Sequence, residues 1–155
     1  MAMPDQIERW LSPLGDLIGP VYPWVSGVHI LGIGCLIGAI LLLDLRLLGA
    51  FRGVAVFQIA GPAVRIASTG LALAVLTGIL LFSAQPAHYL ANTAFVSKLA
   101  ILAIGLVNLA VLHRSRAWAS VVQGGPITPP IKAAAALSLV AWAAAVFAGR
   151  WIAFL

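Results

Sequence analysis

Few side chains in this 155-residue chain can do chemistry, and its three histidines are the most informative of them. His29 stands in the glycine-rich segment SGVHILGIGCLIGA, about 8 Å inside one end of an apolar run at a rise of about 1.5 Å per residue. Nothing on its own helix face can hydrogen-bond the ring, so it needs a partner from another helix or a ligand. An ionisable group at membrane depth is costly, which makes His29 a candidate functional residue.

His88 follows the second apolar run, in SAQPAHYLANTAF, on the same side of the membrane as His29. Two imidazoles on opposite faces of one iron, each at about 2 Å, hold a b-type haem, and helix bundles carry such cofactors between facing helices. We therefore predict that His29 and His88 ligate a haem b, provided that the turn at Pro86 folds the loop back over the bundle. Otherwise His29 is a neutral histidine bonded to a serine or carbonyl of a neighbouring helix, and His88 is a solvated loop residue.

Two cations near the same ends of their helices, Lys98 and Arg150, are candidate cofactor-binding residues, because they can pair with haem propionates. Each can equally extend to lipid phosphates. His113 lies a bilayer thickness away, at the start of the run His-Arg-Ser-Arg, and is expected to be an interfacial residue. Three histidines do not supply the two pairs that a two-haem transmembrane electron path needs.

Copper is an alternative ligand for the same two outer histidines. Soft thioether and thiolate groups select Cu(I), and the chain offers only Met1, Met3 and Cys35, the last on a different helix face from His29. A third interpretation is a cofactor-free structural subunit or homo-oligomer of a larger membrane complex. No serine, cysteine or carboxylate pair has the neighbours that nucleophilic or acid–base catalysis needs. The sequence therefore favours an electron-transfer or accessory protein over an enzyme.

Three further polar residues lie within or beside the apolar runs. Asp44 stands among the arginines of one end, and we expect a structural ion pair with one of three: Arg46, Arg65 or Arg114. Asn108 and Thr77 are predicted to form hydrogen bonds between helices.

The composition is that of an integral membrane protein. Hydrophobic residues make up 63% of the chain and charged residues 8%, against about 45–50% and about 25% in soluble domains. Such a chain has too little polar surface for a water-soluble enzyme. The net charge of +5 comes from scattered single residues, which is not the pattern of a nucleic-acid-binding protein. We expect one membrane domain over residues 1–155.

Four apolar runs approach the length of about 20 residues that a helix needs to cross a bilayer. They predict an all-α, four-transmembrane-helix bundle, with spans at about 22–45, 63–84, 94–113 and 131–152. Gly61-Pro62 is taken as a break before the second span, and residues 51–60 as a short interfacial helix. Residues 1–20 carry an apolar stripe interrupted at Pro13, which predicts an N-terminal interfacial amphipathic helix.

Basic residues set the orientation of these spans. Six fall on one side of the four-span arrangement: Arg46, Arg52, Arg65, Arg114, Arg116 and Lys132. Only Arg9, Lys98 and Arg150 fall on the other. The excess marks the first side as cytoplasmic, which places the protein in the bacterial inner membrane with both termini periplasmic. The expected partners are the lipid bilayer, a periplasmic redox protein or quinone, and further copies of the chain or a larger complex, with no nucleic acid.

Several blocks also carry a family resemblance: HILGIGCLIGAILLLDLRLLG, GLALAVLTGILLFSAQPAHYLANTAFVSKLAIL and NLAVLHRSRAW. Over roughly residues 22–118 the chain resembles an uncharacterised family of small bacterial four-helix membrane proteins. That family is similar in pattern to copper-resistance D type membrane proteins and, more distantly, to four-helix b-type cytochromes. The resemblance implies membrane-embedded histidines with a haem or copper role, at positions that His29 and His88 match. His113 matches the pattern without an assigned role.

Overall fold

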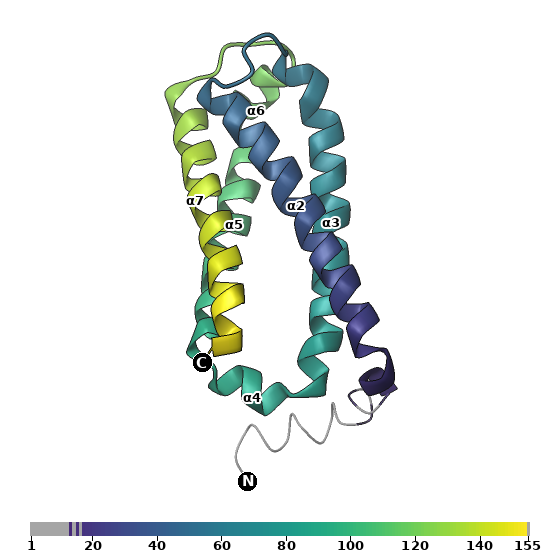
Figure 1. The fold of residues 1–155 in the computed structure, drawn as a ribbon. Coiled ribbons are helices and arrows are strands. Elements are labelled where there is room, and N and C mark those ends of the chain that lie inside the picture. Colours follow the sequence, from purple (N-terminus) through teal and green to yellow (C-terminus); the bar gives the residue numbers. More distant parts are fainter. Residues whose placement is uncertain (1–12, 14, 16, 155) are drawn as a thin grey trace.

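In the computed structural model the chain forms a bundle of four long helices (Figure 1). The structure describes residues 13, 15 and 17–154. The long helices are α2 (Tyr22–Leu48), α3 (Val56–Ala84), α5 (Thr93–Arg114) and α7 (Pro129–Trp151). The short helices are η1 (Gly19–Val21), α4 (Pro86–Ala91), α6 (Arg116–Val121) and η2 (Ile152–Phe154). No strand occurs among the described residues, and the expected all-α fold is confirmed.

Each long helix, with its flanking single turn where one exists, is long and apolar enough to cross a membrane. The prediction of four membrane-spanning helices is therefore confirmed, and the chain is a multi-pass membrane protein. The predicted interfacial helix over residues 1–20 lies for the most part outside the described residues.

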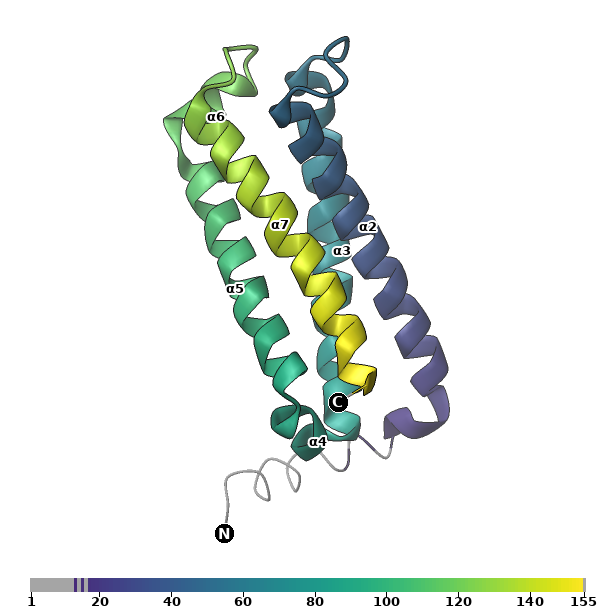
Figure 2. The same cartoon turned by 60° about the vertical axis from the view of Figure 1, so that its left-hand side comes forward.

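The long helices pack as two pairs, α2 with α3 and α5 with α7, and α7 also contacts α2. Figure 2 shows the pairs side by side, with α4 at one end of the bundle and α6 at the other. We call these the α4 end and the α6 end. The first residues of α2 and the last residues of α7 lie at the α4 end (Figure 1).

The second span differs from the prediction, because α3 begins at Val56 and continues through Pro62. Residues 56–60 are thus the first turns of α3 rather than a separate interfacial helix. The helix start is held by Gln58, whose side-chain oxygen accepts from the Ala55 backbone N–H at 3.3 Å. A proline crowds the Cβ of the residue before it in a helical conformation, and Gly61 has no Cβ, so the helix tolerates Pro62.

Glycines allow α2 and α3 to cross with their backbones in contact. A Cβ added at Gly70 would lie 2.6 Å from the carbonyl oxygen of Gly32 and 2.6 Å from the nitrogen of Leu36. A Cβ at Gly32 would lie 3.0 Å from the nitrogen of Ala74. Small residues at such a crossing are typical of packed membrane helices. This contact fixes the register of α2 against α3.

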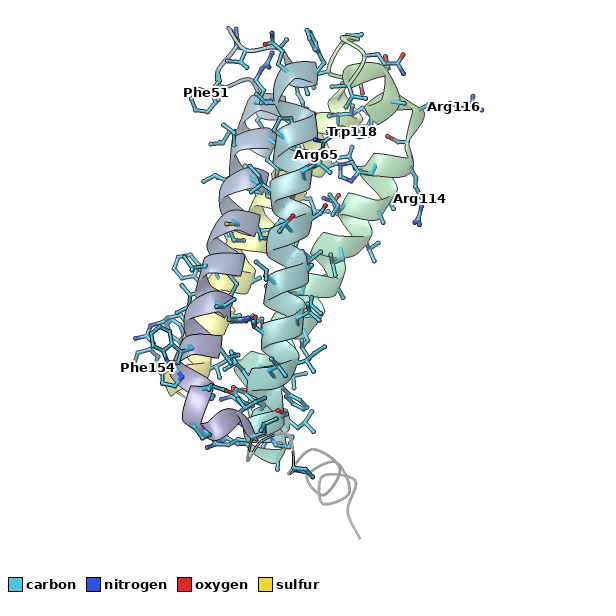
Figure 3. All side chains as sticks on the ribbon, turned by 90° about the vertical axis from the view of Figure 1, so that its right-hand side faces the viewer. Phe51, Arg65, Arg114, Arg116, Trp118 and Phe154 are labelled. Carbon is cyan, nitrogen blue, oxygen red and sulfur yellow. The ribbon has the colours of Figure 1, made fainter. Side chains whose placement is uncertain are left out.

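The largest buried apolar cluster lies at the α6 end, where all four helices and α6 contribute. Its members include Leu47, Val56, Trp118, Val121, Ile131 and Ala135. Figure 3 shows Arg114 and Arg116 directed outward at this end. The six basic residues that the sequence placed on one side all belong to the α6 half of the bundle.

Candidate functional site

His29 lies in the interface between α2 and α3, half-buried, with its ring against Gly78. Its Nδ1 atom is 2.9 Å from the hydroxyl oxygen of Thr77 on α3. A Cβ at Gly78 would approach the His29 Cε1 atom to 3.3 Å, so the glycine leaves the space that the ring occupies. The helix-to-helix partner that His29 requires is therefore Thr77, which confirms the predicted interhelical role of Thr77.

The direction of this hydrogen bond follows from a second one. The Thr77 oxygen lies 2.5 Å from the backbone carbonyl of Leu73, and a carbonyl can only accept. The single hydroxyl proton of Thr77 is thereby used, and the Thr77 oxygen accepts a hydrogen bond from Nδ1–H of His29. In the neutral ring the proton on Nδ1 leaves Nε2 with an unshared electron pair. That is the tautomer in which a histidine ligates a metal through Nε2 while a neighbour orients the ring through Nδ1.

Lys98 is a charged residue in the same half of the bundle as this histidine. It is half-buried on α5. A Cβ at Gly149 of α7 would lie 3.2 Å from its Nζ atom, so the ammonium group runs along the glycine backbone inside the α5–α7 pair. Lys98 forms no ion pair with any described acidic residue. His29 and Thr77 are thus in contact between α2 and α3, and Lys98 lies in the same half of the bundle, within the α5–α7 pair.

The other two predicted site residues lie at the same end but on the outside. His88 is exposed on α4, with its ring edge toward Tyr89 at a centroid distance of 5.9 Å. The Arg150 guanidinium is exposed and stacks over Phe154 at 4.8 Å. Within the described chain, no hydrogen bond or ring contact joins His88 to His29.

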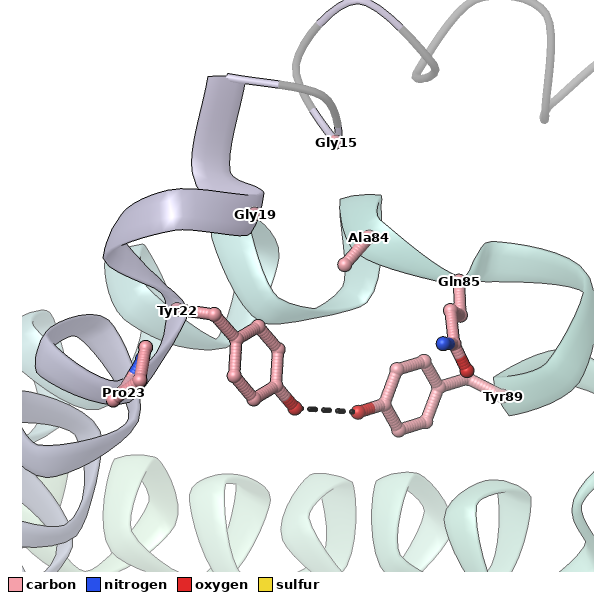
Figure 4. A pocket seen from close by; sticks show the side chains of 7 residues that line it. All are labelled: Gly15, Gly19, Tyr22, Pro23, Ala84, Gln85 and Tyr89. Carbon is pink, nitrogen blue, oxygen red and sulfur yellow. Dashed lines mark hydrogen bonds between the residues drawn. The ribbon is translucent and has the colours of Figure 1, made fainter.

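A tyrosine pair below His29 is a feature that sequence reasoning did not identify as a site. The hydroxyl oxygens of Tyr22 and Tyr89 are 3.5 Å apart, beside a cavity of about 510 Å³ (Figure 4). The cavity is lined by Gly15, Gly19, Tyr22, Pro23, Ala84, Gln85 and Tyr89. Burial, and secondarily the Tyr22 hydroxyl, raises the pKa of Tyr89 to about 12.

The prediction that Asp44 forms an ion pair with an arginine is wrong. Asp44 is 5% exposed and turned toward Ser138 of α7, and its Oδ2 atom has no hydrogen-bond partner among the described residues. Two of the three candidate arginines, Arg65 and Arg114, are exposed. The third, Arg46, donates from Nε to the Val54 carbonyl. Residues two apart on a helix do not face each other, which separates Arg46 from Asp44.

The remaining residues that the sequence analysis singled out lie away from the His29 site. Asn108 donates from Nδ2 to the Ala134 carbonyl of α7 at 3.0 Å, as its predicted interhelical role requires. His113 packs edge-on against Trp118 at 4.8 Å at the α6 end. Cys35 is exposed on α2. Among the described residues, no three histidine, cysteine, aspartate or glutamate side chains gather as a metal site would require.

Comparison with known proteins identifies the family of the chain. The chain matches, over residues 7–155, the model of a family described as "Family of unknown function (DUF6644)", and it belongs to that family. No curated protein and no solved structure matches the chain.

Proposed function

We propose that the protein binds one b-type haem in the α4 half of the bundle and takes part in electron transfer. The observation that carries this proposal is the His29–Thr77 hydrogen bond, which presents the Nε2 electron pair of a neutral imidazole inside an apolar bundle. When bound, the haem supplies the one-electron chemistry. The chain supplies the ligand, its orientation and an environment with little water.

The surroundings of His29 fit an anionic cofactor. Lys98 carries a half-buried positive charge that no described carboxylate neutralises, and a haem propionate is a suitable counter-charge. Arg150 is one residue beyond Gly149, against which Lys98 lies, so it is placed for a second propionate near the membrane surface. Thr77 orients the imidazole as the second partner of a metal-ligating histidine does.

His88 is the candidate for the second histidine that would hold the haem. It lies on a six-residue helix at the correct end of the bundle, and the His88 ring is on its exposed side. To hold the haem, the His88 side chain or α4 would have to turn toward the bundle. The resemblance to four-helix b-type cytochromes that the sequence motifs suggested, which no matching solved structure accompanies, motivates this assignment. For copper, the alternative in the same resemblance, the described residues offer no third ligand beside the two histidines.

The same proposal places the haem near the periplasmic face of a bacterial inner membrane. The excess of basic residues in the α6 half supports a cytoplasmic α6 end. The α4 end, where α2 begins and α7 ends, is then periplasmic, as both termini would be. A periplasmic redox protein or a membrane quinone is the proposed electron partner at this end.

An absorption spectrum before and after dithionite reduction tests the proposal on the detergent-purified protein, with metal analysis of the same sample. We expect a sharpened b-type band, lost in His29→Ala and lost or shifted in His88→Ala. His113→Ala is the matched control, because this half-buried histidine lies at the opposite end and should leave the band unchanged. A protein without a b-type band, even after haem is added, would exclude the proposal. Stoichiometric copper in that sample would favour a copper-handling protein. A sample with neither haem nor copper would favour a structural subunit.

A further inference from the structure

The α6 half of the bundle contains a second ionisable centre, Asp44, which the proposed haem site does not involve. The residue is 5% exposed, although it is only four positions from the end of α2. The residues one turn away on either side, Ile40 and Leu47, are buried and apolar. Asp44 therefore lies within the packed interior, against α7, and not at the membrane surface.

Little polar compensation surrounds this carboxyl group. Ser138 on α7 is the side chain positioned to hydrogen-bond with it, and among the described residues Oδ2 is buried without a partner. The amide of Asn108 on α5 is already engaged with the Ala134 carbonyl. One turn deeper along α7, Nε1 of Trp142 is a second buried polar atom without a described partner.

No described cation neutralises Asp44 from the helices that pack around it. On α2 itself, Arg46 is bonded to the loop carbonyl of Val54. Arg65 on α3 and Lys132 on α7 are exposed. On α5, Arg114 is exposed and His113 packs on Trp118. An ionised carboxylate in such a place would be a buried, unpaired charge, which is strongly unfavourable.

We propose that Asp44 is a proton-binding site within the membrane domain. The buried carboxylate takes up one proton from water at the α6 end to form a neutral carboxylic acid, and it returns that proton to water when it ionises. In the acid form the carboxyl O–H has Ser138 Oγ beside it as an acceptor, which satisfies the group without a counter-ion. The bundle then has a proton-exchanging centre in its α6 half, separate from the histidine centre in its α4 half.

The acid content of the chain permits a direct test. Aspartate occurs only at positions 5, 16 and 44, so the double variant Asp5→Asn, Asp16→Asn leaves Asp44 as the single aspartate. Labelled with ¹³C at the side-chain carboxyl and reconstituted in lipid bilayers, this variant reports Asp44 alone by infrared or solid-state NMR spectroscopy. Asp44 itself is unchanged, so its surroundings are retained.

At pH 5 we expect the Asp44 signal to be mainly that of a carboxylic acid, and at pH 8 to have moved toward carboxylate. An ordinary exposed aspartate, with a pKa of about 3.9, is more than nine-tenths ionised at pH 5. Adding Ser138→Ala should shift the acid band through loss of its hydrogen bond, whereas Ser68→Ala, at an exposed site on α3, should not. A carboxylate signal at pH 5 would overturn the proposal, as would an acid band that Ser138→Ala leaves unmoved.

Discussion

The Nδ1 atom of His29 and the hydroxyl of Thr77 form a 2.9 Å hydrogen bond between α2 and α3, and the proton lies on the histidine side. The bond fixes the tautomer because the Thr77 proton is committed to the Leu73 carbonyl. One residue of α3 thus determines which nitrogen of a half-buried histidine on α2 is available to a ligand. Everything proposed for the α4 half depends on this relationship.

Thr77→Val keeps the shape of the threonine but removes the acceptor for Nδ1–H. We expect ¹⁵N spectra of histidine-labelled protein to show the His29 resonances leaving the pattern of a single Nδ1–H tautomer. If haem is bound, its affinity should fall about 10- to 100-fold, as for other partners of metal-ligating histidines. Thr69→Val is the control, because Thr69 is exposed and bonds only its own helix at Arg65. Equal His29 spectra in both variants would contradict the assigned bond.

Gly70→Ala tests the crossing of α2 and α3. The new Cβ would meet backbone atoms of Gly32 and Leu36 at 2.6 Å, and backbone atoms cannot move aside as a flexible side chain can. We expect a loss of about 1–3 kcal/mol, the usual cost of overpacking, measured by reversible unfolding in mixed micelles.

Gly34→Ala is its matched control on α2. A Cβ at Gly34 would have no atom within 4 Å, and alanine is the better helix former, so this variant should be as stable as the parent or slightly more so. A similar loss in both variants would show that the glycines do not act through the crossing.

The fold was predictable because a bilayer requires long apolar helices, and hydropathy alone detects them. The ends of α2 and α5 were predicted within three residues. The start of α3 was not, because Gly61-Pro62 has the form of a helix break. In the structure the missing Cβ of Gly61 lessens the steric conflict that a proline normally imposes on its neighbour.

The site was less predictable, because it depends on helix register and rotation. The sequence indicated that His29 needs a partner and that Thr77 bonds between helices, but pairing them requires the register set by Gly32 and Gly70. Asp44 was expected beside arginines that are near it in sequence or depth. The rotation of α2 turns it toward α7 instead, and no periodic pattern in the chain encodes that rotation.

Asn92 is expected to be important for stability at the α4 end. Its Oδ1 atom caps α5 by accepting from the backbone N–H groups of Ala94 and Phe95, at 3.0 and 3.2 Å. Its Nδ2 group donates to the Ile152 carbonyl at 3.1 Å, beyond the end of α7. Asn92→Ala should cost about 2 kcal/mol, about one for the cap and about one for the second bond, in the unfolding assay used for Gly70→Ala.

Asn92→Asp separates the two contributions. The carboxylate retains the cap, but it cannot donate to Ile152. We expect amide hydrogen exchange to increase after the end of α7 while the first turn of α5 remains protected. Increased exchange in the first turn of α5 instead would contradict the assignment of the two bonds. Ser97→Ala, at an exposed position of α5, should change neither.

The tyrosine pair at the α4 end predicts a dependence of stability on pH. Tyr89 has a pKa of about 12 in the folded protein, against about 10 in an unfolded chain. Below about pH 10 both states hold the proton, and Tyr89 contributes no pH dependence. As the pH rises from about 10 to about 12, the unfolded state releases its proton first, so the folded state loses stability.

The chain has only two tyrosines, so Tyr22→Phe leaves Tyr89 as the single reporter in an ultraviolet titration of tyrosinate. Burial is the main cause of the raised pKa and the Tyr22 hydroxyl a smaller one. We therefore expect the Tyr89 midpoint in Tyr22→Phe to fall below about 12 but to stay above the value of the same variant in denaturant. Equal midpoints in the folded and denatured variant would mean that Tyr89 is not buried beside the cavity, and that the 3.5 Å contact with Tyr22 alone accounts for its shift.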